Sequence, residues 1–278
     1  MCDHDKADLL LDLLKADSAE YKKIRTAGCS LADRKNAIRS FMNIRMPGPA
    51  PQELLRAQDD YLQEELAEKG IVFLNDIATV SEQCAALAAW EDHISLWQGD
   101  ITRLAVGAVV NAANSRMLGC FIPCHRCIDN AIHSAAGIQL RMECDRIMHD
   151  RKMRFGEAYE EPVGTAVLTS GYNLPCDYVI HTVGPIVTGG LHEGLRQDLR
   201  RCYESVLQCC VEHEIRSVAF CCISTGEFRF PADEAAQIAV RTVRDFLCVH
   251  EGALERIIFN VFKDSDLEIY RQILGISV

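Results

Sequence analysis

The chain has 278 residues, of which 49% are hydrophobic and 25% are charged, a composition typical of a globular protein that buries most of its apolar surface. Its net charge of −11 disfavours binding of duplex nucleic acid, which needs a basic face, but does not exclude a small anion held by backbone N–H groups. Fourteen cysteines do not indicate a disulfide scaffold at this size. No apolar run approaches the ~20 residues that cross a bilayer, and no signal-peptide pattern follows Met1, so we expect a cytoplasmic protein without membrane partners.

Residues 1–88 are expected to form an N-terminal helical extension. Apolar residues recur there at helical spacing. The pattern breaks at the proline-rich stretch 46–51 and resumes after Pro51, where proline suits the first turn of a helix. We see no catalytic pattern in this segment and interpret it as a helical lobe. Its recurring apolar positions are Leu9, Leu10, Leu13, Leu14, Ile38, Phe41, Met42, Leu54, Leu55, Tyr61, Leu62 and Leu66.

Residues 89–278 are predicted to form a separate α/β domain. Short β-branched runs alternate there with longer amphipathic ones, and this alternation indicates layers of helices on a sheet. Ligands of such folds bind beyond the carboxyl ends of the strands. The expected strands are 94–97, 106–111, 165–169, 178–182, 217–222 and 256–261, and the expected helices are 128–148, 195–213, 232–249 and 265–274.

The strongest local pattern is the segment 119–127, GCFIPCHRC, which we call the cysteine loop. It holds four potential ligands for a soft or borderline metal, namely Cys120, Cys124, His125 and Cys127. Thiolates and imidazole are the ligands that Zn²⁺ prefers. We favour zinc over a redox loop, a disulfide loop or a chance cluster. Three ligands from one loop would leave one coordination position open, as in catalytic zinc sites.

Four shorter motifs follow expected strands or begin expected helices. The first three also have a purely structural interpretation: a turn, a turn with Asx capping, and, in the third, an N-cap for Asp129 and a packing role for His133. The last motif lies between a strand and a helix, where N–H groups can bind a phosphate, but it lacks the Gly-Lys-Ser/Thr of a P-loop. The motifs are QGDIT (98–102), NAAN (111–114), IDNAIHSAAG (128–137) and ISTGEFRFP (223–231).

In order and spacing these segments, together with GTAVLTSGYNLPCDYVIHTVGP (164–185), resemble a macrodomain over residues 95–261. The cysteine loop replaces the glycine-rich loop of most members and is similar to that of the zinc-containing branch, which also tends to carry N-terminal helices. The resemblance implies a three-layer α/β/α fold with a mixed central sheet and an N-terminal helical segment. It also implies mono-ADP-ribosyl hydrolase activity, in a branch often encoded beside a sirtuin-like transferase and a lipoyl-carrier protein.

The resemblance also implies roles for individual residues. Asp100, with the backbone of Ile101, would bind the adenine amino group, and Asn260 and Phe262 would lie near the adenine. Asn111 and Asn114 would face the distal ribose, and Asp129 would orient a water molecule there, so that Asp129 and Asn114 are the expected catalytic residues. Zn²⁺ would be held by Cys120, His125 and Cys127, with Cys124 as a second choice. The diphosphate would be wrapped by Ser224, Thr225, Gly226, Glu227 and Phe228.

The expected function is therefore zinc-dependent removal of ADP-ribose from a mono-ADP-ribosylated protein. The resemblance implies a lipoyl-carrier protein, modified by a sirtuin-like transferase, as one candidate target. Two alternatives use the same pocket: a module that only binds ADP-ribose, with a structural zinc closed by Cys124, and a deacetylase of O-acetyl-ADP-ribose. The sequence does not distinguish these alternatives, nor does it identify the acceptor amino acid.

Overall fold

The computed structural model describes residues 3–19, 21–23, 28, 30–84 and 89–276. By its internal contacts the chain divides into two compact units. We call the first the helical unit; it comprises the described residues of Met1–Ile71, Met117–Tyr159 and Tyr172–Leu174. The second, the sheet unit, comprises those of Val72–Arg116, Glu160–Gly171 and Pro175–Val278. The predicted domain boundary between residues 88 and 89 comes from the sequence pattern, whereas these units come from contacts in space. The boundary therefore stays a prediction.

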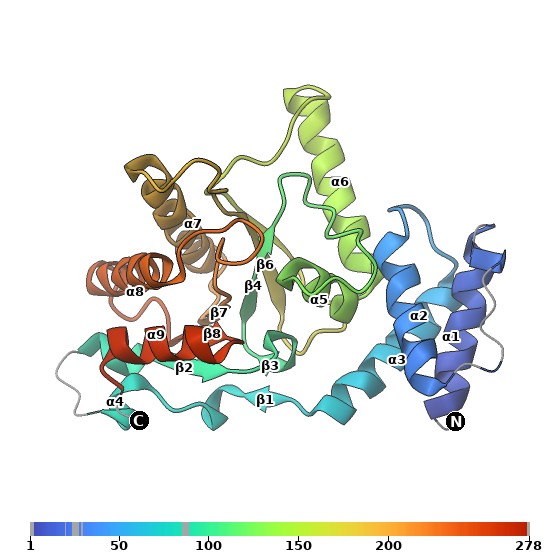
Figure 1. Cartoon of the computed structure of the whole chain (residues 1–278), viewed down its shortest axis with the longest axis horizontal. Helices are drawn as coiled ribbons and strands as arrows, with labels where there is room; N and C mark the ends of the chain where they lie inside the picture. Colours follow the sequence, from blue (N-terminus) through green and yellow to red (C-terminus); the bar gives the residue numbers. More distant parts are fainter. Residues whose placement is uncertain (1–2, 20, 24–27, 29, 85–88, 277–278) are drawn as a thin grey trace. The chain divides into compact units, whose positions relative to one another are not determined.

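The helical unit is built from α1 (Asp3–Asp17), α2 (Leu31–Ile44), α3 (Gln52–Lys69), α5 (Ile128–Ala136) and α6 (Ile138–Phe155), with the short 3-10 helix η1 (Tyr21–Lys23). Helix α1 packs along both α2 and α3 (Figure 1). A shared core includes Leu10, Leu14, Phe41 and Leu54, at the helical spacing that the sequence predicts, and the Tyr21 ring stacks on Phe41 with centroids 4.6 Å apart.

Helices α5 and α6 replace the single helix that the sequence predicts over 128–148. The prediction was wrong at Gly137, which ends α5 with φ 95°. A Cβ at this position would collide with the Gln58 amide of α3. The same Gln58 side chain accepts a hydrogen bond from the Ile138 N–H at 2.9 Å, so it satisfies one of the backbone donors that the start of α6 leaves open.

The sheet unit contains a six-stranded sheet of order β2-β8-β7-β4-β6-β5. Only β5, paired with β6, is antiparallel, so the sheet is mixed, as predicted. Predicted and observed strands agree to within two residues at each end. The strands are β2 (Ile94–Gln98), β4 (Ala108–Ala113), β5 (Ala166–Ser170), β6 (Tyr178–Val183), β7 (Ser217–Phe220) and β8 (Arg256–Val261), and a separate parallel pair is formed by β1 (Val72–Phe73) and β3 (Leu104–Ala105).

The helices of the sheet unit include three long ones whose positions the sequence predicts to within two residues. They are α7 (Glu193–Glu212), α8 (Ala232–Val249) and α9 (Asp264–Leu274), and α8 packs between α7 and α9 (Figure 1). Short helical turns complete the unit: η2 (Leu74–Asp76), α4 (Val80–Gln83), η3 (Ala89–His93) and η4 (Ile101–Arg103). Within the described residues, no helix has the length and apolarity needed to span a membrane.

Candidate functional site

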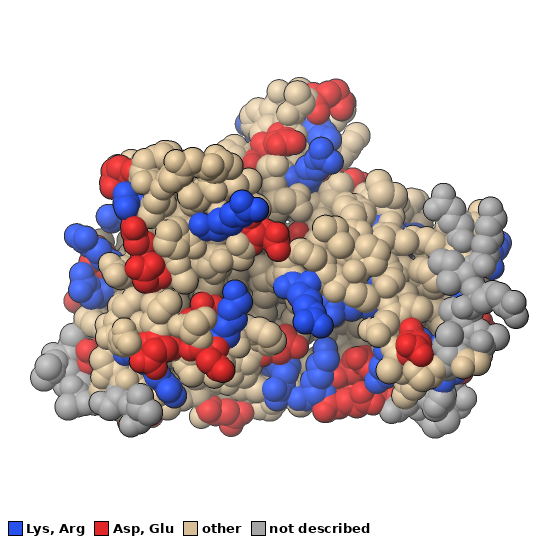
Figure 2. All heavy atoms as spheres, viewed as in Figure 1, with Lys and Arg blue, Asp and Glu red and all other residues tan. Residues whose placement is uncertain are grey.

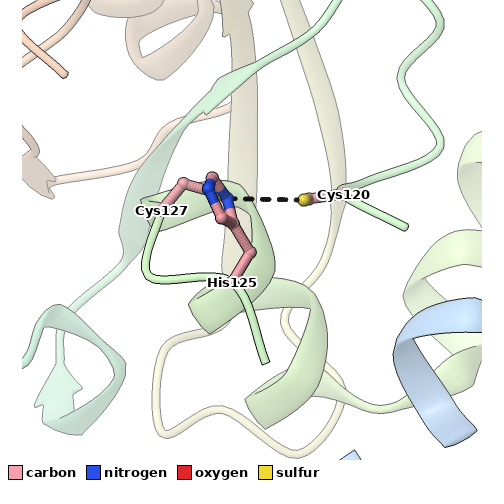
Figure 3. Close-up of side chains that lie close together, drawn as sticks. All are labelled: Cys120, His125 and Cys127. Carbon is pink, nitrogen blue, oxygen red and sulfur yellow. Dashed lines mark hydrogen bonds between the residues drawn. The ribbon is translucent and has the colours of Figure 1, made fainter. Parts of the chain in front are cut away.

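The cysteine loop of the helical unit brings three of its four potential ligands together. The ligand atoms of Cys120, His125 and Cys127 all lie within 4.8 Å of one another, and the Cys120 Sγ lies 3.7 Å from the His125 Nδ1 (Figure 3). Two thiols and one imidazole at this separation fit a single Zn²⁺ ion, because such donors bind it at about 2.0–2.3 Å in tetrahedral directions. Three protein ligands would leave a fourth position for water or substrate.

Cys124 lies outside this cluster. Its Sγ lies 3.3 Å from the Ser40 Oγ and 3.5 Å from the Asn36 carbonyl oxygen, both on α2. Its backbone has φ 50°, an uncommon conformation for a residue other than glycine. The structure therefore separates Cys124, whose role the sequence left open, from the other three candidate ligands.

Cys127 ends the loop and also begins α5. Its Sγ accepts a hydrogen bond from the Asn130 N–H at 3.4 Å and so acts as the N-cap of the helix. The structural interpretation of Asp129 as the N-cap of this helix was therefore wrong. Burial raises the pKa of the Cys127 thiol to about 12, and the neighbouring Cys120 and Asp129 act in the same direction. A bound cation would favour the thiolate form of this residue.

Asp129 lies in the first turn of α5, two residues after Cys127, and its side chain is only 8% exposed. The carboxylate Oδ1 lies 3.5 Å from the His133 Nε2 one turn later. His133 is itself buried, and a Cβ at Gly119 would collide with its ring. This arrangement agrees with the packing role expected for His133 and leaves Asp129 at the end of the helix that adjoins the cysteine loop.

In the sheet unit, the expected adenine-binding residues form one turn after β2. The Asp100 Oδ1 caps η4 by accepting hydrogen bonds from the Thr102 N–H at 3.0 Å and the Thr102 Oγ1 at 2.7 Å. Its second oxygen accepts no hydrogen bond from the described residues, so it is available to an amino group. Asn260 braces the turn: its Nδ2 donates to the Gly99 carbonyl at 3.0 Å and, at 3.4 Å, to that of Trp97.

The two asparagines of β4 have different surroundings. Asn111 is fully buried, and its Nδ2 lies 3.1 Å from the His181 Nδ1 on β6. The His181 Nε2 in turn lies 2.9 Å from the Thr169 Oγ1 on β5. Asn114 lies just beyond the end of β4, half-buried, and its Oδ1 accepts from the Arg116 N–H. Of the two, Asn114 is the one at the carboxyl end of the strand, where ligands bind.

The expected diphosphate loop follows β7 as a tight turn. Hydrogen bonds from the Arg229 N–H to Gly226 and from the Phe230 N–H to Ser224 close it, each at 3.0 Å. Ser224 has φ 66° and is 5% exposed, and its Oγ is buried with no hydrogen-bond partner among the described residues. A buried hydroxyl without a partner is costly, so an acceptor such as a phosphate oxygen would relieve it. A Cβ at Gly184, just after β6, would collide with this Oγ.

These motifs share one edge of the sheet. Strands β2, β8, β7 and β4 are parallel neighbours, so their carboxyl ends bring Asp100, Asn260, the 224–228 turn and Asn114 to the same edge. On the face that Figure 2 draws, acidic and basic side chains are scattered among uncharged ones. Among its described residues, that face therefore presents no broad basic surface to an anionic ligand.

Several residues that organise these motifs were not predicted. Arg39 and Asn43 of α2 and Arg141 of α6 contact the cysteine loop, whereas His181 and Gly184 lie against Asn111 and Ser224. No local pattern identifies Arg39 and Asn43, because their partners lie more than 80 residues away in the chain. His181 and Gly184 lie in the segment 164–185, but the sequence assigns no role to either residue. Only the fold brings them together.

A mixed, largely parallel sheet with polar motifs along one edge defines an α/β fold of the kind that binds its ligands beyond the carboxyl ends of the strands. The macro domain model matches residues 110–239. The chain is 42% identical over 275 residues to the "Protein-ADP-ribose hydrolase" of Treponema medium, covering 99% of this chain and 100% of that protein. The chain therefore belongs to the macro domain family.

Solved structures show the same fold. The Trypanosoma brucei macrodomain in complex with ADP has a TM-score of 0.64 at 31% identity and covers 85% of this chain and 96% of its own. The same macrodomain in complex with ADP-ribose has a TM-score of 0.62 at 31% identity and covers 85% and 95%. These relatives confirm the predicted three-layer α/β/α macrodomain fold with a mixed sheet and N-terminal helices.

Proposed function

We propose that this protein is a protein-ADP-ribose hydrolase that uses a zinc ion held by Cys120, His125 and Cys127 to remove ADP-ribose from a modified side chain. The observation that carries the proposal is the convergence of these three ligand atoms within 4.8 Å, with the buried Asp129 in the first turn of the next helix. The near full-length relative of Treponema medium carries the hydrolase name, and it supports an enzyme acting on the ADP-ribosyl linkage.

ADP-ribose would be bound by the edge of the sheet unit. In this proposal Asp100 and Ile101 bind the adenine, and Asn260 holds the turn that carries them through its bond to the Gly99 carbonyl. Ser224, Thr225, Gly226, Glu227 and Phe228 bind the diphosphate, with the partnerless Ser224 hydroxyl as one donor. Asn114 binds the distal ribose, whereas the buried Asn111 acts by fixing β4 through His181.

The chemistry is hydrolysis at the anomeric carbon of the distal ribose. A Zn²⁺ ion held by Cys120, His125 and Cys127 would supply Lewis acidity at this position. Asp129 orients the attacking water and accepts its proton as the new carbon–oxygen bond forms. The bond to the acceptor side chain breaks with its electron pair, and the acceptor leaves as it takes up a proton. Fixing the substrate at the adenine and the diphosphate contributes by orientation.

The test is release of ADP-ribose from a mono-ADP-ribosylated protein, measured with and without a chelator. Cys120→Ala and Asp129→Ala should abolish turnover, and the chelator should do the same to the wild type. Cys248→Ala, at an exposed cysteine, is the matched control and should keep full activity. Full activity in both site variants would refute the assignment of the site.

One observation bears on the alternative in which the protein only binds ADP-ribose. That alternative needs Cys124 as a fourth zinc ligand, yet the Cys124 Sγ lies against the Ser40 hydroxyl instead. Calorimetry would detect ADP-ribose binding in both cases, so turnover decides between them. Deacetylation of O-acetyl-ADP-ribose is tested by the same assay with that substrate. A lipoyl-carrier protein as the target, and a cytoplasmic location, stay predictions.

A further inference from the structure

We propose that α2 of the N-terminal helical segment shapes the cysteine loop, and that Asn43 and Arg39 are positioning residues for its metal ligands. The inference deepens the proposed function and rests on it. Residues 114–127 form no helix or strand, so the loop lacks a regular hydrogen-bond ladder of its own. Three ligand atoms can nevertheless converge only if the backbone between Cys120 and Cys127 is held in one shape.

Asn43 holds the middle of the loop. It lies near the end of α2, is 1% exposed, and its Oδ1 accepts a hydrogen bond from the Cys124 N–H at 2.9 Å. Its Nδ2 donates to the Ser134 Oγ of α5 at 2.8 Å. One buried amide therefore ties the residue just before His125 to the helix that begins at Cys127. The Sγ of Cys124 also lies 3.3 Å from the hydroxyl of Ser40, one turn earlier on α2. Cys124 is therefore held by α2 through both its backbone and its side chain.

Arg39 holds the last part of the loop, which carries His125 and Cys127. Its Nη2 donates to the His125 carbonyl at 3.3 Å and to the Asn130 Oδ1 at 2.7 Å. Asn130 is fully buried; its Nδ2 donates to the Ile122 carbonyl at 3.0 Å, and its N–H to the Cys127 Sγ at 3.4 Å. The guanidinium thus orients an asparagine that contacts a ligand sulfur directly.

Arg141 of α6 ties the start of the loop to the end of α2. It is buried, and its Nε donates to the Leu118 carbonyl at 2.6 Å, next to Gly119. Its Nη1 donates to the carbonyls of Met42, Asn43 and Arg45 at 2.7–3.0 Å, which the end of a helix leaves without partners. The last turn of α2 and the backbone before Cys120 therefore share one guanidinium.

These contacts give the N-terminal helical segment a role in metal binding, although its sequence carries no catalytic pattern. The groups that orient metal ligands from outside usually change metal affinity by 10–100-fold when they are removed. Hydrogen bonds to the backbone of the loop act in the same way here, because they fix where the Cys120, His125 and Cys127 side chains begin. A helical lobe that only added hydrophobic packing would have no such effect on the metal.

The experiment measures the zinc dissociation constant of the full chain by competition with a chromogenic chelator, and the absorption spectrum of the Co²⁺-loaded protein. Asn43→Ala and Arg39→Ala should each weaken zinc binding by about 10-fold or more and alter the Co²⁺ bands, while ADP-ribose affinity by calorimetry stays unchanged. Arg34→Ala is the matched control. Arg34 also lies on α2, but its ion pair, at 2.9 Å, is with Asp8 of α1.

Wild-type zinc affinity in both Asn43→Ala and Arg39→Ala would overturn the inference, as would an equal loss in Arg34→Ala. If Asn43→Ala fails to fold, the half-exposed Arg39 decides the question, and Arg39→Lys should recover only part of the affinity because it lacks the forked donors. A wild-type chain that binds no zinc would instead refute the zinc of the proposed function. The two failures are therefore distinguishable.

Discussion

His181 provides a direct test of the polar network beneath the sheet edge. Its ring is fully buried, and this burial lowers its pKa from 6.5 to about 3. The partners agree with a neutral ring: the Asn111 Nδ2 donates to Nδ1, and Nε2–H donates to the Thr169 Oγ1, which itself donates to the Val179 carbonyl. Protonation of Nδ1 would place two donors 3.1 Å apart.

The sign of the pH effect follows from this depressed pKa. The unfolded chain takes up a proton on His181 below pH 6.5, whereas the folded protein does so only near pH 3. The stabilisation is therefore complete above pH 6.5 and is lost as the pH falls from there toward 3. Between pH 7.5 and pH 5 the loss is about 2 kcal/mol, from 1.36 kcal/mol per pH unit over roughly 1.5 units.

Urea unfolding at pH 7.5 and pH 5 measures this loss. His181→Gln keeps an amide donor and acceptor but does not titrate, so its free energy of unfolding should fall by about 2 kcal/mol less than that of the wild type. His149→Gln is the control, because that exposed ring stays in water in both states. Equal pH dependence in the wild type and His181→Gln would refute the argument that the ring is buried in its neutral form.

Three further predictions address the binding edge, the metal and stability. Gly184→Ala should weaken ADP-ribose binding by about 10-fold in calorimetry, because its Cβ would displace the Ser224 hydroxyl, a loss of about 1.4 kcal/mol; Gly189→Ala, which meets open space, should bind normally. Cys124→Ala should keep zinc affinity and turnover, and a large loss of both would favour a four-ligand site. Arg45→Ala should lower the free energy of unfolding by about 2 kcal/mol in urea titrations, because it removes the ion pair with the half-buried Asp17 and the hydrogen bonds to three loop carbonyls.

The sequence predicts the elements of the sheet unit well, because their patterns are local. Alternating and β-branched runs predict all six strands of the large sheet, and α8 begins and ends where the sequence places it. The short β1–β3 pair was not predicted, because two-residue strands have no periodicity to detect. The break between α5 and α6 had a signal in Gly137, but the reason for it, the Gln58 amide of α3, lies 80 residues away in the chain.

The site shows the same division between local chemistry and long-range structure. The residue types of the cysteine loop indicate a zinc site, because thiolates and imidazole are the ligands that Zn²⁺ prefers, and that site stays a prediction. They do not decide which three of the four are ligands. The structure separates Cys124 from the others through contacts with Ser40, Asn36 and Asn43, none of which has a motif.

The same contacts with the helical segment therefore bear on two questions: how the loop is ordered and which of its side chains can act as ligands. A short loop without regular structure can present three metal ligands only if other elements reduce its conformational freedom before the metal arrives, since each residue ordered on binding costs about 1–2 kcal/mol. The hydrogen bonds of Asn43 and Arg141, both buried, and of the half-exposed Arg39 are the contacts through which α2 and α6 would supply that order. The contacts of α2 with Cys124 also hold it apart from the other three donors, so a metal bound by those three would keep a coordination position open for substrate or water.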